Sequence, residues 1–331
     1  MTTGPGSTEL DASAGFPALT APARRGERRL PWRVRLARGL TPYALLLPTV
    51  AVIVAVLAYP LYFLVRLSFE KYGLEELIAH EGTWIGLDNY SRILHDGTFW
   101  AVAVRTVLFT LANVALTMVL GTLLAHLIAR LGGFMRMLMT TALVLVWAMP
   151  VVVAVNVWQW MVDFEFGVAN YALTELRLGE FTNHDWFESP VSGLAVITAL
   201  VVWGALPFVV ITLYAGLAQV PGELVEAAQL DGAGPWRVFR DVTFPILKPI
   251  FVILTSLSVI WDFQVFNQVW LMRNANPTED YFLMGVYSFF ESFRISEYGY
   301  GAAIAVLMVV LLFVITLFYV RQMLRIGEVE A

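Results

Sequence analysis

Long apolar runs alternate with short polar segments along most of the chain. Six runs are long enough to cross about 30 Å of hydrocarbon as α-helices. They cover residues 41–68, 99–129, 137–162, 191–218, 250–272 and 299–322. None shows the alternating pattern of a membrane β-strand, and a helix satisfies its own backbone groups in lipid. The pattern therefore predicts an all-α membrane protein, with six transmembrane helices in a domain that covers residues 39–331.

Residues 1–38 are expected to form a cytoplasmic tail. The first 23 residues are small, polar and rich in Pro and Gly, which is typical of disorder, and a cluster of arginines follows. The apolar run after this cluster is too long for a secretory signal and lacks a clear small-residue cleavage site. We interpret it as an uncleaved first span.

Composition supports the membrane class. The chain is 59% hydrophobic and 14% charged, with a mean hydropathy of +0.71, against about 45–50% and about 25% in soluble domains. It has no cysteine and four scattered histidines, which excludes thiolate nucleophiles and Cys-type metal sites. Neither HExxH nor GxSxG occurs. We therefore expect no catalytic residue, no metal site and no enzyme activity in this chain.

Charge predicts the orientation. If both termini face the cytoplasm, the inner segments hold 14 of the 21 basic residues and the outer loops hold 5. Arg66 and Arg105 lie near the outer ends of spans. Because basic residues gather on the cytoplasmic side, a multi-pass protein with both termini in the cytoplasm is expected.

The largest inner loop, residues 219–249, contains the start and stop signals of two short helices. Pro221 favours a helix start, Gly232 or Gly234 an end, and Pro235 a second start. Pro245 and Pro249 are predicted to mark the turn into the fifth span. The loop suits either docking of a partner protein or a helical hairpin that lies on the membrane.

A specific resemblance favours docking. The stretch "EAAQLDGAGPWRVFRDVTFPILKP" (226–249) resembles the EAA loop of ABC-transporter permeases of the importer class. That resemblance implies a coupling helix that fits a cleft on a cytoplasmic ATPase. The matching residues are Glu226, Ala227, Ala228, Asp231, Gly232, Ala233, Phe239 and Pro245.

The resemblance extends over about residues 40–325. Segments 45–69, 85–102, 164–171, 202–221 and 298–313 are similar to the first permease subunit of carbohydrate importers of the maltose/glycerol-3-phosphate/trehalose type. This implies a type I importer (MetI-like) fold in a bacterial inner membrane. The chain departs from the pattern at Arg105, where many relatives carry Asn.

The resemblance also implies partners. They are a second homologous permease, two ATP-binding subunits, an extracellular or periplasmic sugar-binding protein, a sugar and membrane lipid; no nucleic acid is expected. The only lysines, Lys71 and Lys248, do not stand in the P-loop motif GxxxxGK[ST]. ATP and magnesium are therefore expected on the partner ATPase, and no cofactor on this chain.

Polar residues inside a span are costly and so nominate a substrate path. Trp261, Gln264 and Gln268 stand at i, i+3 and i+7 of the fifth span and are predicted to share one helix face. Flat aromatics and amides suit a neutral saccharide, although such amides also join helices. The other candidates for the path are Asn267 and, from the resemblance, Trp203 and Phe208 of the fourth span.

Asp262 is the one acid deep inside a span. It suits either a bond to a substrate hydroxyl or a pair with a basic residue of a partner subunit.

These observations predict a permease subunit of an ATP-driven importer for a di- or oligosaccharide, which forms half of the path and works by alternating access. One alternative is an ABC permease for glycerol phosphate or another small solute. Another is a secondary transporter driven by an ion gradient, for which neither paired buried acids nor an internal repeat is visible.

Overall fold

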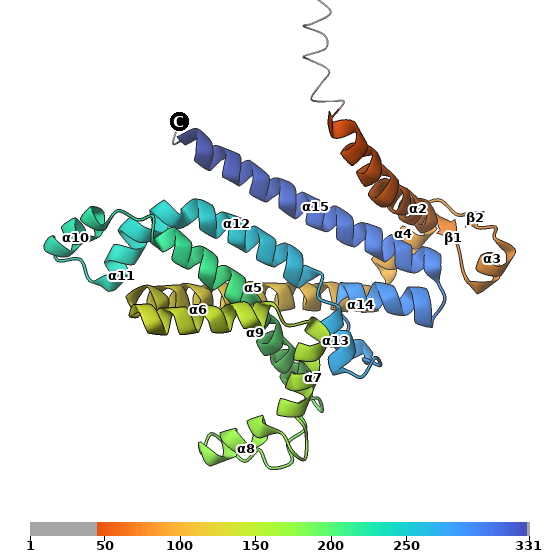
Figure 1. Cartoon of the computed structure of the whole chain (residues 1–331). Coiled ribbons are helices and arrows are strands. Elements are labelled where there is room, and N and C mark those ends of the chain that lie inside the picture. The colour runs from red at the N-terminus through yellow and green to blue at the C-terminus, as the bar shows by residue number, and fades with distance from the viewer. Residues whose placement is uncertain (1–44, 330–331) are drawn as a thin grey trace, which may run out of the picture. The chain divides into compact units, whose positions relative to one another are not determined.

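The structure is a computed structural model that describes residues 45–329 (Figure 1). The chain divides into two compact units at Tyr59 and Pro60, and each unit is considered by itself. The first contributes residues 45–59, with the π-helical turn η1 (Val54–Ala58). The predicted tail, residues 1–38, lies outside the described residues.

The part of the chain from Tyr59 onward is helical apart from one short antiparallel hairpin, β1–β2. Its elements are α2 (Tyr59–Ser68), β1 (Glu70–Lys71), α3 (Leu74–Ala79), β2 (Thr83–Trp84), α4 (Asp88–His95), α5 (Gly97–Arg130), α6 (Gly133–Trp147), α7 (Val151–Met161), α8 (Val168–Glu175), α9 (Pro190–Leu217), α10 (Gly222–Leu230), α11 (Pro235–Val238), η2 (Phe239–Thr243), α12 (Phe244–Phe263), α13 (Asn267–Met272), η3 (Glu279–Tyr281), α14 (Met284–Phe289), η4 (Phe290–Arg294) and α15 (Tyr298–Val329).

Five helical stretches of the described residues are long and apolar enough to cross a membrane. They are Leu45–Ser68, Gly97–Arg130, Pro190–Leu217, Pro235–Phe263 and Tyr298–Met323. A sixth candidate is the pair α6 and α7, which are bent by 103° at the break between them. The prediction of one continuous helix over 137–162 is therefore wrong. The break ends at Pro150, because proline disfavours helical backbone in the residue before it and lacks an amide donor.

Close packing of α5 on α9 forms the centre of the second unit. A Cβ atom on Gly121 of α5 would lie 2.6 Å from Cγ1 of Val209 on α9, so only glycine permits this approach. The inner half of this packing is apolar. It contains the buried residues Ala125, Ile128, Val209, Val210, Leu213 and Leu254.

The fifth span begins earlier than its hydropathy indicates. A helix runs from Pro235 through η2 into α12, so Pro245 and Pro249 lie inside it and not at a turn. At η2, Phe244 N donates to Phe239 O five residues back. This wider π-helical turn accommodates the ring of Pro245, which would clash with a carbonyl in a regular α-helix. Of the two predicted short helices, only α10 is separate.

The fifth span also ends earlier than predicted. α12 stops at Phe263, residues 264–266 are not helical, and α13 starts at Asn267. α10 and α11 lie at one end of α12, while α13 and α14 lie near the other (Figure 1). The predicted cytoplasmic loop and the interrupted part of the span therefore stand at opposite ends of one long helix.

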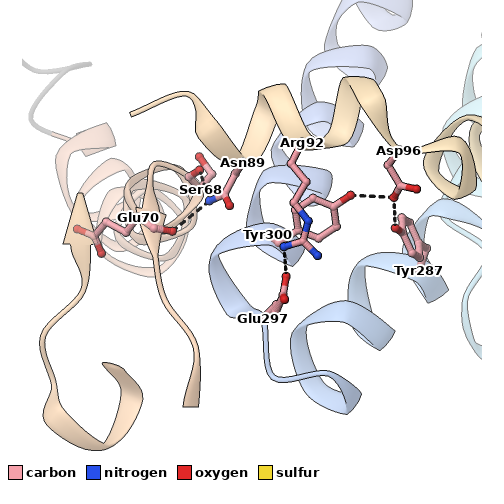
Figure 2. Close-up of polar contacts among 8 residues, drawn as sticks. All are labelled: Ser68, Glu70, Asn89, Arg92, Asp96, Tyr287, Glu297 and Tyr300. Carbon is pink, nitrogen blue, oxygen red and sulfur yellow. Dashed lines mark hydrogen bonds and ion pairs between the residues drawn. The ribbon is translucent and has the colours of Figure 1, made fainter. Parts of the chain in front are cut away.

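A polar network joins distant segments at the predicted outer end, as Figure 2 shows. One carboxylate oxygen of Asp96 accepts hydrogen bonds from the hydroxyls of Tyr287 (2.6 Å) and Tyr300 (2.8 Å). Arg92 pairs with Glu297 and places its guanidinium 4.1 Å from the ring centroid of Tyr300. These contacts fasten α4 and the start of α5 to α14 and α15.

The hairpin is joined to the same frame. The buried amide of Asn89 donates to the backbone oxygens of Ser68 and Glu70, at 3.0 Å each. Gly299 N donates to Tyr72 O at 3.0 Å. The predicted outer end is therefore held together by hydrogen bonds and an ion pair between distant segments, as well as by helix packing.

Candidate functional site

A hollow of about 230 Å³ lies beside the interruption of the fifth span. It is lined by the break between α6 and α7, by α9 and by residues 261–268. Three of the six predicted path residues, Trp203, Trp261 and Gln268, meet there. Ligand pockets usually measure about 300–1,000 Å³. The hollow is therefore too small to enclose an oligosaccharide within this chain alone.

Aromatic rings surround the hollow. Trp261 is 49% exposed, and its ring meets that of Phe208 edge to face at a centroid distance of 5.3 Å. Trp203 contacts Trp158 at 6.1 Å. Phe208 also stacks with Trp147 at 6.3 Å. Phe208 thus packs behind the residues that line the hollow. Trp147 lines the hollow itself, although it was not among the predicted path residues.

Proline inside α9 adds a polar group at the same level. Pro207 is buried within the helix and has no amide hydrogen. The carbonyl of Trp203, four residues earlier, therefore lacks its usual helical donor. The hollow itself combines flat apolar rings with the polar side chains of Asp262 and Gln268.

The prediction that Trp261, Gln264 and Gln268 share one helix face is wrong, because α12 ends between them. Gln264 is exposed, and its amide donates to Ile260 O at 3.1 Å. Asn267 is exposed and begins α13. Neither residue lines the hollow, whereas Gln268 does so across the interruption.

Asp262 also lines the hollow. Its side chain is only 4% exposed, and its Oδ2 atom has no hydrogen-bond partner among the described residues. The sequence identifies Asp262 as an unusual acid in a span, but only the structure places it beside Trp203 and Gln268.

The predicted coupling residues occupy α10 and the turn after it. Glu226 and Ala227 are exposed on α10, and Asp231 and Gly232 are exposed in the turn. Gly232 has φ of +80°, a left-handed conformation that favours glycine. The turn closes with a hydrogen bond of 3.0 Å from Ala233 N to Ala228 O. The DGA part of the motif therefore shapes the end of this helix.

Two large apolar side chains of the same segment are exposed. Leu230 at the end of α10 is 90% exposed and Trp236 on α11 is 71% exposed, and the segment also holds the exposed acids Glu226 and Asp231. A patch of apolar and acidic side chains at the predicted cytoplasmic end suits a protein partner. The EAA pattern does not single out Leu230 or Trp236, and their exposure is visible only in the structure.

Phe239 is not exposed on this surface. It is half-buried, and its ring contacts His126 of α5 at 5.3 Å and Trp236 at 5.7 Å between centroids. His126 Nδ1 lies 2.9 Å from Thr122 O. Phe239 therefore connects the beginning of the fifth span to α5.

Arg105 forms hydrogen bonds with the backbone at the predicted outer end. Its guanidinium donates to Glu279 O at 2.9 Å and to Phe282 O at 3.0 Å. Thr106, the next residue, accepts a hydrogen bond of 2.9 Å from Met284 N. These contacts hold the segment before α14 against α5.

Comparison with known proteins identifies relatives along nearly the whole chain. Residues 117–326 match the family model described as "Binding-protein-dependent transport system inner membrane component". The chain is 44% identical, over 294 residues, to the diacetylchitobiose uptake system permease protein DasB of Streptomyces coelicolor, covering 89% of this chain and 90% of that protein. It is 33% identical to the sulfoquinovosyl glycerol transport system permease protein SmoG of Agrobacterium fabrum, covering 90% and 96%.

A solved structure shares the fold. A chain of a bacterial ABC transporter involved in the import of the acidic polysaccharide alginate superposes with a TM-score of 0.73 and 21% identity. The superposition covers 88% of this chain and 99% of that one. The fold described above is thus one that occurs in a chain of that transporter.

Proposed function

The chain belongs to the family of binding-protein-dependent transport system inner membrane components, and from this premise we propose that it carries a di- or oligosaccharide. In this proposal it is one permease subunit of an ATP-driven importer. The observation that carries the sugar assignment is the hollow in which Trp203, Trp261 and Gln268 meet. The 44% identity to a diacetylchitobiose uptake permease supports it.

The chemistry of the hollow matches a sugar ring. A pyranose offers weakly apolar faces and a rim of hydroxyl groups. The indole faces of Trp203 and Trp261 suit the former, and the amide of Gln268, which both donates and accepts, suits the latter. No covalent step is required of any of these residues.

A second, homologous permease completes the path in this proposal. The hollow is smaller than an oligosaccharide needs. A partner subunit that contributes a similar surface would enclose the substrate between the two. A binding protein outside the membrane would deliver the sugar.

In this proposal α10 docks on one of two ATP-binding subunits, which hold the ATP and magnesium. The exposed residues Glu226, Leu230 and Asp231 would enter a cleft on the ATPase. This arrangement places both termini in the cytoplasm, in agreement with the distribution of basic residues.

The long helix Pro235–Phe263 would transmit the movement of the ATPase. Its 29 residues span roughly 44 Å at about 1.5 Å per residue. Its inner end adjoins α10, and its outer end carries Trp261 and Asp262 into the hollow. A tilt imposed at α10 would therefore change the shape of the hollow, as alternating access requires.

Uptake of a radiolabelled disaccharide tests the proposal. Cells that carry the complete transporter, but lack other disaccharide uptake systems, should accumulate N,N′-diacetylchitobiose or another uncharged disaccharide in an ATP-dependent manner. Trp261→Ala should lower this uptake at least tenfold with the complex intact. Trp84→Ala, on an exposed outer tryptophan, is the matched control. If the wild type accumulates none of a panel of uncharged disaccharides, the sugar assignment is wrong.

A further inference from the structure

A groove of about 400 Å³ lies at the predicted inner end, between the last turns of α5 and the beginning of the long helix that starts at Pro235. It is separate from the hollow described above, because the two share no lining residue. α5 contributes Leu123 and Leu127 to it, and the long helix contributes Trp236 and Phe239. Most of its lining is therefore apolar.

One guanidinium group also lines this groove. Arg130 is the last residue of α5, and its side chain is exposed. None of the four ion pairs formed by the described residues includes Arg130, and none of the described residues that line the groove is acidic. The cation can therefore bind an anion from outside this chain.

The groove lies where two candidate spans end. One runs to Arg130 and the other starts at Pro235, so these residues mark the predicted level of the inner lipid headgroups. Trp236, whose indole is exposed, belongs to the residue types that gather at that level. Leu123 precedes Arg130 by two helical turns, which places it about 10 Å deeper at about 1.5 Å per residue. Apolar side chains thus lie toward the membrane interior, and the cation lies at the headgroup level.

This order matches the order of groups in a phospholipid, whose acyl chains lie below its phosphate. A guanidinium group binds phosphate oxygens through two parallel hydrogen bonds, and basic pockets between helices on the cytoplasmic side bind anionic headgroups. A free phosphate would pair with Arg130 but leave the apolar lining uncovered. A helix of another subunit would cover the leucines but would have to bring an acid to Arg130. One anionic lipid satisfies both parts.

We propose that this groove binds an anionic phospholipid of the inner leaflet, with an acyl chain along Leu123 and Leu127 and the phosphate at Arg130. The inference goes beyond the proposed function and does not depend on which solute is carried. Because α5 and the long helix both line the groove, the lipid holds the start of the long helix against α5. It does so next to the contact between Phe239 and His126.

The test uses the complete transporter, purified in an uncharged detergent. Phosphatidylglycerol and phosphatidylcholine are titrated separately, and native mass spectrometry counts the bound lipids. The wild type should bind its first phosphatidylglycerol at least tenfold more tightly than phosphatidylcholine, and Arg130→Gln should weaken that binding at least tenfold. Arg321→Gln is the matched control, because it removes an exposed cation of α15 that does not line the groove.

A second variant tests the apolar part of the groove. Leu123→Trp fills the space of the acyl chain while Arg130 is unchanged, and it should weaken phosphatidylglycerol binding at least tenfold. Leu111→Trp is the matched control, since Leu111 is an exposed residue of α5 outside the groove. Without lipid, all variants should melt at the wild-type temperature. Phosphatidylglycerol should raise the melting temperature of the wild type more than that of either groove variant, because a ligand that binds only the folded state stabilises it.

Each contrary result has a distinct meaning. Wild-type binding of phosphatidylglycerol by both Arg130→Gln and Leu123→Trp would overturn the site. Equal affinity of the wild type for both lipids would contradict an anionic ligand, and complete displacement by inorganic phosphate would favour a free anion.

A protein occupant is tested separately. The natural chain has no cysteine, so Leu127→Cys gives a single attachment point for a cross-linker in native membranes. A cross-link to the second permease would show that a protein, and not a lipid, covers the groove. If the wild type takes up no uncharged disaccharide but still binds phosphatidylglycerol through Arg130, the proposed function fails and this inference stands.

Discussion

The two ends of the fifth and sixth spans are held by different kinds of contact. At the predicted outer end, side-chain hydrogen bonds join residues far apart in sequence: Asp96 and Tyr300 are 204 positions apart, and Arg92 and Glu297 are 205 apart (Figure 2). In residues 219–249, every side-chain hydrogen bond joins residues no more than four positions apart.

This difference indicates that the outer end is the more rigid of the two. Networks of buried polar groups define one geometry and resist distortion. The inner end instead presents the short helix α10 with exposed Leu230, followed by exposed Trp236 at the start of the long helix. The ring of Phe239 on the long helix contacts His126 of α5. An element held by few contacts can move as a unit when a partner moves it. The outer end thus resembles a fixed frame, and the inner end a docking element.

The largest expected effect comes from breaking the outer network. Asp96→Ala leaves the buried hydroxyls of Tyr287 and Tyr300 without their acceptor. Each bond to a charged group contributes about 1.5–3 kcal/mol, and we expect a loss of about 3 kcal/mol in the free energy of unfolding. Thermal unfolding of the solubilised protein, followed by near-UV circular dichroism, measures it. Asp88→Ala is the matched control, and equal melting temperatures for the two variants would contradict the network's role.

A second variant at the same position changes the response of stability to acid. Burial by itself would raise the pKa of Asp96, but hydrogen bonds from Tyr287, Tyr300 and the backbone amide of Thr98 hold it below its ordinary value. The carboxylate therefore stabilises the fold above the unfolded pKa of about 3.9, and this contribution is lost as the pH falls through the lower folded pKa. Asp96→Asn should show a weaker dependence of stability on pH below about 4 than the wild type.

An intermediate effect is expected at the inner end, on activity and not on stability. Glu226→Lys reverses an exposed charge on α10 and should lower ATP-dependent uptake about tenfold, equivalent to about 1.4 kcal/mol. Its melting temperature should match the wild type, because the side chain forms no hydrogen bond within the described residues. Glu75→Lys makes the same change on the outer helix α3 and should transport normally. Normal uptake by Glu226→Lys would remove α10 from the coupling mechanism.

The smallest expected effect is on stability and comes from Glu291, at the predicted outer end. Glu291 lines a polar hollow of about 450 Å³ together with Arg92 and Asp96. Burial, and then the charge of Glu297, raise the pKa of Glu291 above its ordinary value. The protonated form is therefore favoured by folding, and its stabilising contribution is lost as the pH rises through the raised pKa.

Glu291→Gln imitates that protonated form. It should raise stability at pH 7 by less than about 1 kcal/mol, since the group is only partly buried, and the gain should disappear near pH 4. Melting temperatures measured from pH 4 to pH 8 test this, with Glu188→Gln as an exposed control. A gain that is constant over this range would show that the charge of Glu291 is not responsible.

The sequence predicts most helices well because hydropathy is a local property. The predicted span 99–129 corresponds to α5 (Gly97–Arg130), and 191–218 corresponds to α9 (Pro190–Leu217). Local pattern fails where a helix stops inside an apolar run. Neither the bend before Val151 nor the end of α12 at Phe263 ends its apolar run, because further apolar residues follow to about residues 162 and 272.

Only part of the candidate site was predicted, because the sequence shows residue types and local spacing but not which helices meet. Residue type singles out Trp261 and Gln268, and regular helix geometry groups them with Gln264. In the structure Gln264 does not line the hollow, and its amide donates to Ile260 O instead. Trp147 carries no motif and lines the hollow only because α6 ends there. Side chains that meet from four separate helices cannot be grouped by their spacing along the chain.

The sequence by itself determined the membrane class, the family and the motif at the inner end, because composition, hydropathy and a contiguous motif are all read along the chain. The tertiary structure decided which side chains share the hollow and that Oδ2 of Asp262 has no hydrogen-bond partner among the described residues. It also decided that Asp96 joins tyrosines about 200 residues away. The physical reason is that hydropathy adds up residue by residue, whereas hydrogen bonds and burial depend on the positions in space that distant segments reach only when the helices pack.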